Sequence, residues 1–92
     1  MDQVLFRVHA IARMFQYSVS EEDVRQILLA GEVIQQYPDD RPYPSRLVLG
    51  WRGSQPIHVV AAYNVEDQET IVITVYEPDP DQWEPDFRRK RP

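Results

Sequence analysis

The hydrophobic pattern is clearest between Pro56 and Pro78, where two apolar runs flank a short polar turn. The runs read PIHVVAAY and TIVITVYEP, and NVEDQE separates them. Two β-branched runs joined in this way predict a β-hairpin. Both faces of both runs are largely apolar, so we expect two central strands that are covered on each side. The polar exceptions are His58, Thr74 and Tyr76, and polar groups in a buried setting are the informative ones.

Two helices are expected ahead of the strands. Apolar residues recur at helical spacing from about Val4 to Phe15 and predict an amphipathic helix. A second helix is expected after Ser20, because this residue type caps helix N-termini and acidic residues follow it through the first turn. Gly31 is the expected stop. Helices this short need to pack on the sheet. Their apolar stripes would be Val4, Leu5, Val8, Ile11, Ala12 and Phe15 in the first, and Val24, Ile27 and Leu28 in the second.

The remaining strands follow the second helix. Glu32–Tyr37 predicts an edge strand, and Arg46–Trp51 predicts a strand that a RGSQ turn joins to the central hairpin. Between them, PDDRPYPS carries three prolines and predicts a stiff loop. The order of elements therefore predicts an α+β fold in which two N-terminal helices pack on one face of a three- to four-stranded antiparallel sheet.

We expect one domain over residues 1–78 and a proline-rich tail over residues 79–92. A chain of 92 residues is close to the lower end of independent folding. The tail is expected to be extended, to pack on the domain or flank it, and to be pinned by Trp83 and Phe87.

Composition excludes several kinds of chemistry. The chain has no cysteine, so disulfides, thiolate zinc sites and cysteine nucleophiles are excluded. The two histidines are far apart and the three glycines are scattered, so the sequence shows neither metal-ligand spacing nor a phosphate-binding loop. We therefore expect no metal and no cofactor. Without a signal sequence or a long apolar run, we expect a cytoplasmic protein that does not enter a membrane.

The charge has two aspects. A net charge of −5 speaks against a protein that is coated with nucleic acid. Yet of the 10 basic residues all but Lys90 are arginine, the side chain that forks onto phosphates and carboxylates.

The hairpin brings two polar pairs together. If its turn is roughly symmetric, paired residue numbers sum to about 134, so His58 faces Tyr76 and Val60 faces Thr74 on one side of the sheet. A histidine beside a tyrosine offers an acid or base and a phosphate-binding hydroxyl. The same pair is also what a hydrogen-bonded polar pair in a partly buried sheet looks like. Both interpretations remain open.

Two further groups are candidates for binding phosphate. His9 and Arg13 are one helical turn apart and project from the same flank, as a general base and phosphate clamp or as a solvated pair. Arg41, Tyr43 and Arg46 gather two guanidiniums and a phenol in and beside the proline-rich loop. They form either a platform for phosphate and base stacking or arginines that pair with nearby acids.

The C-terminal RRKR run supplies Arg88 and Arg89 as candidate phosphate contacts, although short basic tails are commonly only solvated. Metal-free general acid–base chemistry is the one catalytic mode that these residues support.

Several segments resemble one family in order along the chain. They are HAIARM at 9–14, SEEDV at 20–24, GEVIQQYPDDRPYPSRLVLG at 31–50, HVVAAY at 58–63 and ITVYEPDPDQW at 73–83. They are similar to a bacterial and archaeal family of small uncharacterised proteins that is regarded as RelE/ParE-like. Its members are often encoded beside a zinc-ribbon antitoxin of the kind that partners MqsR. The resemblance covers nearly the whole chain.

The resemblance implies a RelE-like fold and a metal-independent endoribonuclease toxin, an mRNA interferase of a type II toxin–antitoxin system. Its substrate would be RNA and its partner a cognate antitoxin. Carried onto this chain, the resemblance makes His9 and His58 the acid/base candidates and Arg46 a further catalytic candidate. Arg13 and Arg41, with Arg46, would hold phosphate, and Tyr76 or Tyr43 would orient it or stack on a base.

The alternative is a non-catalytic interaction module of the same fold, in which a sheet edge or the proline-rich loop recruits a partner by strand addition. Clustering of His9, Arg13, Arg46, His58 and Tyr76 in one exposed cleft would favour the enzyme. Burial of both histidines, or arginines dispersed over the surface, would favour the interaction module.

Overall fold

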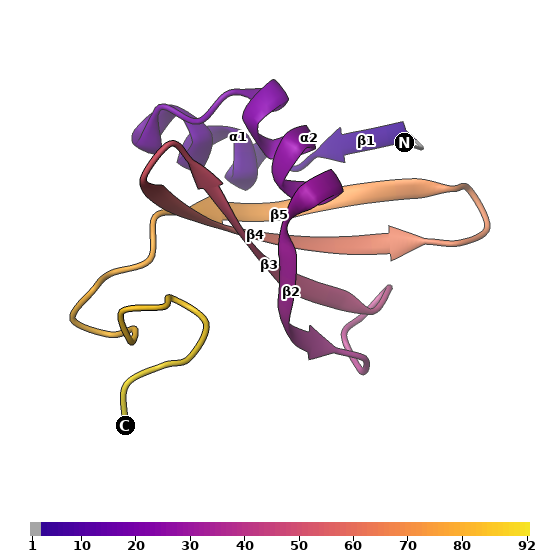
Figure 1. The fold of residues 1–92 in the computed structure, drawn as a ribbon. Coiled ribbons are helices and arrows are strands. Elements are labelled where there is room, and N and C mark those ends of the chain that lie inside the picture. The colour runs from indigo at the N-terminus through magenta and orange to yellow at the C-terminus, as the bar shows by residue number, and fades with distance from the viewer. Residues whose placement is uncertain (1–2) are drawn as a thin grey trace.

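A computed structural model of the protein describes residues 3–92 and contains two helices and one five-stranded sheet (Figure 1). The strands lie in the order β1-β5-β4-β3-β2. The elements are β1 (Gln3–Phe6), α1 (Val8–Tyr17), α2 (Glu21–Ala30), β2 (Glu32–Tyr37), β3 (Ser45–Arg52), β4 (Gln55–Asn64) and β5 (Glu69–Tyr76). The α+β class and the two helices are confirmed. The sheet is larger than expected and is mixed, because β1 pairs with β5 in parallel.

The first strand corrects the expected helix from Val4 to Phe15. Residues 3–6 form β1, which pairs with β5 from Gln3 opposite Glu69 to Phe6 opposite Val72. Arg7 then takes an extended conformation as the N-cap, and α1 begins at Val8. A short apolar run suits a strand as well as a helix turn, and periodicity alone does not separate the two. The nearby free edge of β5 supplies the backbone partners that decide the outcome.

The predicted hairpin and its register are confirmed. His58 pairs with Tyr76 and Val60 pairs with Thr74 across β4 and β5. The register then shifts by one residue, which leaves Ile73 as the extra residue of a β-bulge.

The bulge decides which face of the sheet Thr74 occupies. Ile73 is the extra residue. If the pairing seen near the turn continued along β5 without it, Thr74 would lie opposite Val59, whose side chain is in the core. With the bulge, Thr74 and Tyr76 share the face of His58. Bulges that redirect side chains in this way are common beside functional sites.

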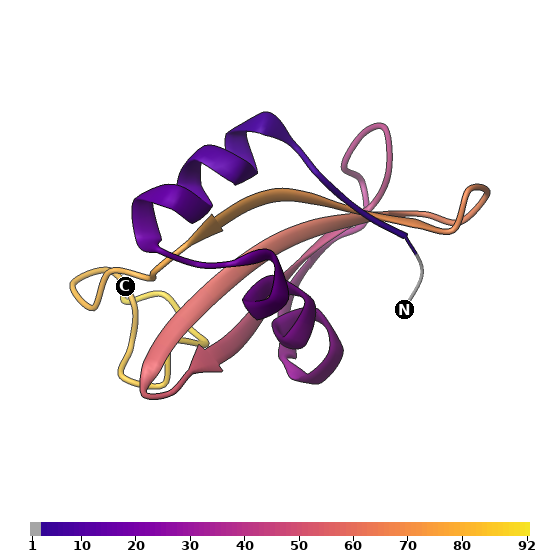
Figure 2. The same cartoon turned by 90° about the horizontal axis from the view of Figure 1, so that it is seen from above.

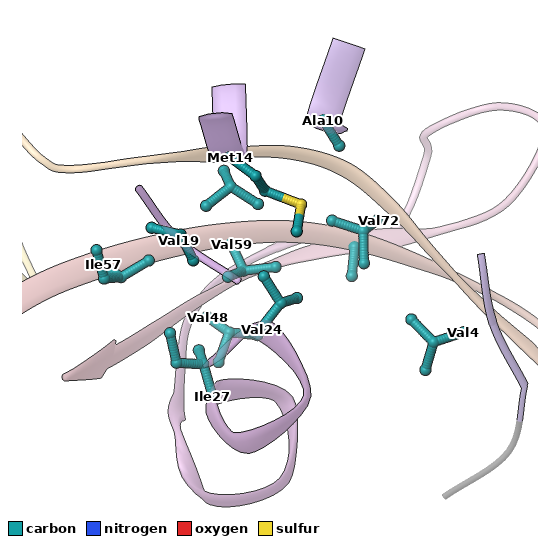
Figure 3. Packing of buried hydrophobic residues seen from close by; sticks show 12 residues of the cluster. Val4, Ala10, Met14, Val19, Val24, Ile27, Val48, Ile57, Val59 and Val72 are labelled. Carbon is teal, nitrogen blue, oxygen red and sulfur yellow. The ribbon is translucent and has the colours of Figure 1, made fainter. Parts of the chain in front are cut away.

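Both helices cover one face of the sheet (Figure 2). The predicted start of α2 is confirmed, since the Ser20 side chain accepts from the Asp23 backbone and the Asp23 carboxylate accepts from the Ser20 backbone. Ala10 and Met14 of α1 point toward the strands, as do residues of α2 (Figure 3). The buried cluster comprises Val4, Ala10, Met14, Val19, Val24, Ile27, Val48, Ile57, Val59, Ala61, Val72 and Val75.

The apolar stripe expected on the first helix does not face this core. Val8 is 84% exposed, Phe15 82% and Ile11 42%, whereas the buried residues of α1 are Ala10 and Met14. The stripe took its phase from the apolar residues at positions 4 and 5, which belong to β1. Once those two residues are assigned to β1, the buried side of α1 is defined by Ala10 and Met14, which are four positions apart.

The tail from residue 79 is folded back rather than extended. The Glu84 N–H donates to the Arg89 carbonyl and the Arg91 N–H donates to the Gln82 carbonyl, each over 2.8 Å. Trp83 is only 7% exposed and packs against His58, so the tail covers the sheet on the face opposite the helices (Figure 1). Within residues 3–92, no helix is long and apolar enough to cross a membrane.

Candidate functional site

An exposed histidine, His9, lies where α1 passes the edge of β5. The pairing of β1 with β5 ends at Val72, and α1 lies beside the continuation of that strand. There the His9 Nε2 atom is 3.1 Å from the Thr74 hydroxyl oxygen. His9 is exposed, and its Nδ1 has no hydrogen-bond partner among the residues that the structure describes. The contact with Thr74 therefore engages one ring nitrogen and leaves the other without a partner within residues 3–92.

Arg13 lies one turn further along the same flank of α1. One of its terminal nitrogens donates to Gln16 over 3.0 Å, and its guanidinium lies over the Tyr17 ring at 5.3 Å from the centroid. No carboxylate pairs with it within residues 3–92, and its Nε is buried without a hydrogen-bond partner there. An unpaired buried donor is uncommon in a folded protein. We call His9, Arg13 and Thr74 the β5-edge site.

His58 is not part of this site. It is 0% exposed, with Nε2 2.9 Å from the Phe87 carbonyl oxygen and Nδ1 3.2 Å from the Tyr76 hydroxyl. Because a carbonyl only accepts, Nε2 carries the proton and Nδ1 accepts from Tyr76. The Trp83 ring meets the imidazole edge-on at 4.5 Å. The pair of His58 and Tyr76 is thus a buried hydrogen-bonded pair, and His58 holds the tail to the sheet.

Burial shifts the pKa of both members of this pair toward the neutral form. Burial lowers the pKa of His58, and the hydrogen bond to the Phe87 carbonyl opposes it only in part. Burial also raises the pKa of Tyr76, with the Tyr37 phenol adding to the effect. Tyr76 therefore remains a neutral phenol, and both ring nitrogens of the neutral His58 are already engaged, by Tyr76 and by the Phe87 carbonyl.

Docking of the tail is expected to weaken as the pH falls below about 6.5, the ordinary pKa of a histidine. The folded state lowers the pKa of His58, so at pH values between the two pKa values His58 on β4 binds an additional proton when the tail is undocked. The contribution of neutral His58 to docking of the tail is complete at a pH above the ordinary histidine pKa. It is lost as the pH falls toward the lower pKa that His58 has in the folded chain. The fluorescence of Trp83 and the rate of tryptic cleavage in the tail measure it.

His58→Phe is the control variant, because it removes the titrating group and should remove the pH dependence between pH 7.5 and 5. The pKa of Asp86 is lowered, first by the hydrogen bond from the Arg88 backbone, so that carboxylate stays charged in this range. A tail equally protected at both pH values in the native chain would contradict the role given to His58.

The loop residues expected to bind phosphate do not join the β5-edge site. Arg46 pairs with Ala61 and so points to the helix-covered face, away from His58. Arg41 is exposed in the loop, while the Tyr43 hydroxyl accepts from the Asn64 amide over 3.0 Å. Neither arginine forms an ion pair within the described part of the chain. Of the two interpretations left open for these arginines, pairing with nearby acids is therefore not seen.

The tail arginines form a separate group on the other side of the molecule. The Arg88 Nε donates to the Glu32 carboxylate over 2.7 Å, and Arg89 pairs with Asp86 at 3.1 Å. Both arginines line a cavity of about 460 Å³ with Tyr37 and other residues of the tail and sheet. The expected phosphate ligands are thus distributed over three places.

Sequence reasoning missed one residue of the site, Thr74, and the neighbour of Arg13, Tyr17. Thr74 stood out as a polar residue in an apolar strand, but nothing in the sequence linked it to His9. Tyr17 follows Arg13 by four positions, which is the spacing at which helical side chains meet. Within residues 3–92 no three His, Asp or Glu side chains gather as metal ligands.

The fold and site describe an α+β domain in which two helices and a folded tail cover opposite faces of a mixed sheet. Residues 6–77 match the family described as "Domain of unknown function (DUF4258)", and the chain belongs to this family. The match runs from the end of β1 to the residue after β5 and includes the whole β5-edge site. The chain matches no curated protein and no solved structure.

Proposed function

We propose that this protein is a RelE-like, MqsR-like toxin of a type II toxin–antitoxin system and acts as a metal-independent endoribonuclease on mRNA. The observation that carries the proposal is the β5-edge site. It offers an exposed imidazole, a hydroxyl that orients it and an arginine without a carboxylate partner in residues 3–92. General acid–base catalysis with charge stabilisation needs these groups and no metal.

The proposed reaction is an attack of the ribose 2′-oxygen on the adjacent phosphorus. His9 takes the proton from the 2′-hydroxyl, the new P–O bond forms, and the bond from phosphorus to the 5′-oxygen breaks. The departing 5′-oxygen takes a proton from solvent, and the products are a 2′,3′-cyclic phosphate and a 5′-hydroxyl. Arg13 opposes the charge that builds on the phosphorane.

Tyr76 has a narrower role in this proposal than the sequence implied. Its hydroxyl proton is donated to His58, so its oxygen is left to accept a hydrogen bond, for example from a ribose hydroxyl. The tail arginines and Arg41 lie away from His9 and would contact the RNA backbone outside the cleaved bond.

The proposed partner is a cognate antitoxin, with a zinc-ribbon protein as the expected kind, and the proposed compartment is the cytoplasm. An antitoxin that inhibits cleavage would cover the β5-edge site.

A non-catalytic interaction module is the second candidate, and three observations favour it. His58 is buried and the arginines are dispersed, as described above. In addition, β2 is an edge strand of the sheet and most of its residues are exposed, so its outer edge is open to strand addition. A register shift between Val33 and Gln35 interrupts that edge.

Induced expression of the native chain is expected to arrest bacterial growth, and the purified chain is expected to cleave RNA in the presence of EDTA. Cleavage should leave 2′,3′-cyclic phosphate ends, which mass spectrometry of a short oligonucleotide detects. An oligonucleotide with a 2′-deoxy substitution at the cleaved position is the matched control and should resist. No cleavage by a soluble, folded chain would exclude the ribonuclease and leave the interaction module.

A further inference from the structure

Helix α1 carries an exposed apolar flank that the fold does not use. Val8 is 84% exposed, Phe15 82% and Ile11 42%. The three positions follow the spacing i, i+3 and i+7, so they form one row along the helix. A single exposed apolar side chain is ordinary, but a row of three on one helix marks an interaction surface.

A groove runs beside this row. It has a volume of about 470 Å³ and is lined by Ile11, Phe15, Phe6 and Met14 on its apolar side, and by Glu21 and the residues before it at the start of α2. The C-terminal tail is on the opposite face of the sheet and does not reach it. No segment within residues 3–92 covers the groove.

The charges beside the groove select the partner. Glu21 lines it and Glu22 is exposed next in sequence, and neither forms an ion pair in the described part of the chain. The third acid of this turn, Asp23, is engaged by Arg52 at 3.4 Å. A partner that brings basic side chains to Glu21 and Glu22 therefore gains attraction there, whereas an acidic one is repelled.

The groove also selects the conformation of the partner. It is lined mainly by α1 and the start of α2, and the edge strand β1 reaches it only with its last residue, Phe6, so it offers at most the end of a strand to an extended peptide. A helical peptide satisfies its backbone hydrogen bonds internally and therefore buries no unpaired N–H and C=O groups. Val8, Ile11 and Phe15 offer on the order of 300–400 Å² of apolar surface for burial. This area is well below the roughly 800 Å² that each partner buries in a stable dimer. This argues against a second copy of the chain.

We propose that the groove beside Val8, Ile11 and Phe15 binds a basic amphipathic helix of another polypeptide. The apolar residues of that helix pack along the row on α1, and its lysine or arginine residues meet Glu21 and Glu22. The proposal does not rest on ribonuclease activity, because the surface lies on the flank of α1 away from His9 and Arg13.

The test uses two synthetic helical peptides of about 15 residues, the length at which isolated helices begin to be stable. Both carry leucine at every third or fourth position, and one has lysine where the other has glutamate. Fluorescence anisotropy with the full chain measures binding. The lysine peptide is expected to bind, and Phe15→Ser is expected to weaken it by about tenfold or more. Glu21→Lys combined with Glu22→Lys should reverse the preference between the peptides.

Leu29→Ser is the matched control, since Leu29 is also an exposed apolar helix residue but lies outside the groove. It should leave binding unchanged, and the exposure of Phe15 means that Phe15→Ser should keep the native circular dichroism spectrum. Equal binding of both peptides, no binding of either, or full binding by Phe15→Ser would overturn the proposal. Self-association or vesicle binding that depends on Phe15 would overturn it in favour of a second copy or a lipid surface.

Discussion

Replacing His9 by alanine is expected to lower the rate of RNA cleavage by about 10²- to 10⁴-fold, the usual contribution of a general acid or base. The substitution should leave the fold intact, because the imidazole is exposed and its one hydrogen bond, to Thr74, lies at the surface. Single-turnover cleavage of a short RNA by native and variant chains, with circular dichroism as the check on folding, measures the effect.

Two variants distinguish chemistry from positioning. Thr74→Val removes the hydroxyl that orients His9 but keeps the β-branched shape, so a smaller loss of about tenfold is expected. His58→Phe serves as the matched histidine control, because His58 does not reach solvent in the folded chain. If His58→Phe abolished cleavage and His9→Ala did not, the β5-edge site would be the wrong site.

Trp83→Ala is expected to have the largest effect on the packing of the tail. A buried tryptophan contributes about 3–5 kcal/mol relative to alanine, and Trp83 also meets the His58 imidazole edge-on and lies beneath the Lys90 ammonium. Because the loss falls on docking of the tail, opening of the tail should become about 100-fold more frequent or more.

Limited trypsin digestion measures this opening, since Arg88, Arg89 and Lys90 lie in the tail and each offers a cleavage position. Mass spectrometry reports the cleaved product while circular dichroism reports the remaining domain. Trp51→Ala is the control, because Trp51 is 50% exposed and its ring meets Phe87 of the tail in an edge-to-face arrangement at 6.0 Å between centroids. Equal digestion of the two variants would show that Trp83 does not hold the tail.

The hairpin of β4 and β5 and the second helix were predictable because local chemistry sets them. Two apolar, β-branched runs around a short polar turn were enough to predict the hairpin. The pairing of His58 with Tyr76 also needs the bulge at Ile73, because the register at the turn end alone would place His58 opposite Val75. Ser20 followed by three acidic residues was enough to place the start of α2. In each case the pattern and its structural cause lie within a few residues of each other in sequence.

The features that were missed depend on contacts between distant parts of the chain. β1 is a strand because β5 offers it a free edge, and the phase of α1 follows from that change. Burial of His58 depends on a tail that begins about twenty residues later and folds back in a way that its prolines did not indicate. The contact of His9 with Thr74 requires both the edge position of α1 and the bulge at Ile73.

The separation of these two residues has a consequence for synthesis of the protein. His9 and Thr74 are 65 positions apart. β1 cannot pair until β5, the last strand in the sequence, has been synthesised. A chain emerging from the ribosome therefore presents α1 long before its neighbouring strand exists, and such distant contacts form late. An interrupted translation product that stops before β5 has no β5-edge site. The proposed activity would thus belong only to chains that have been translated through the end of the sheet.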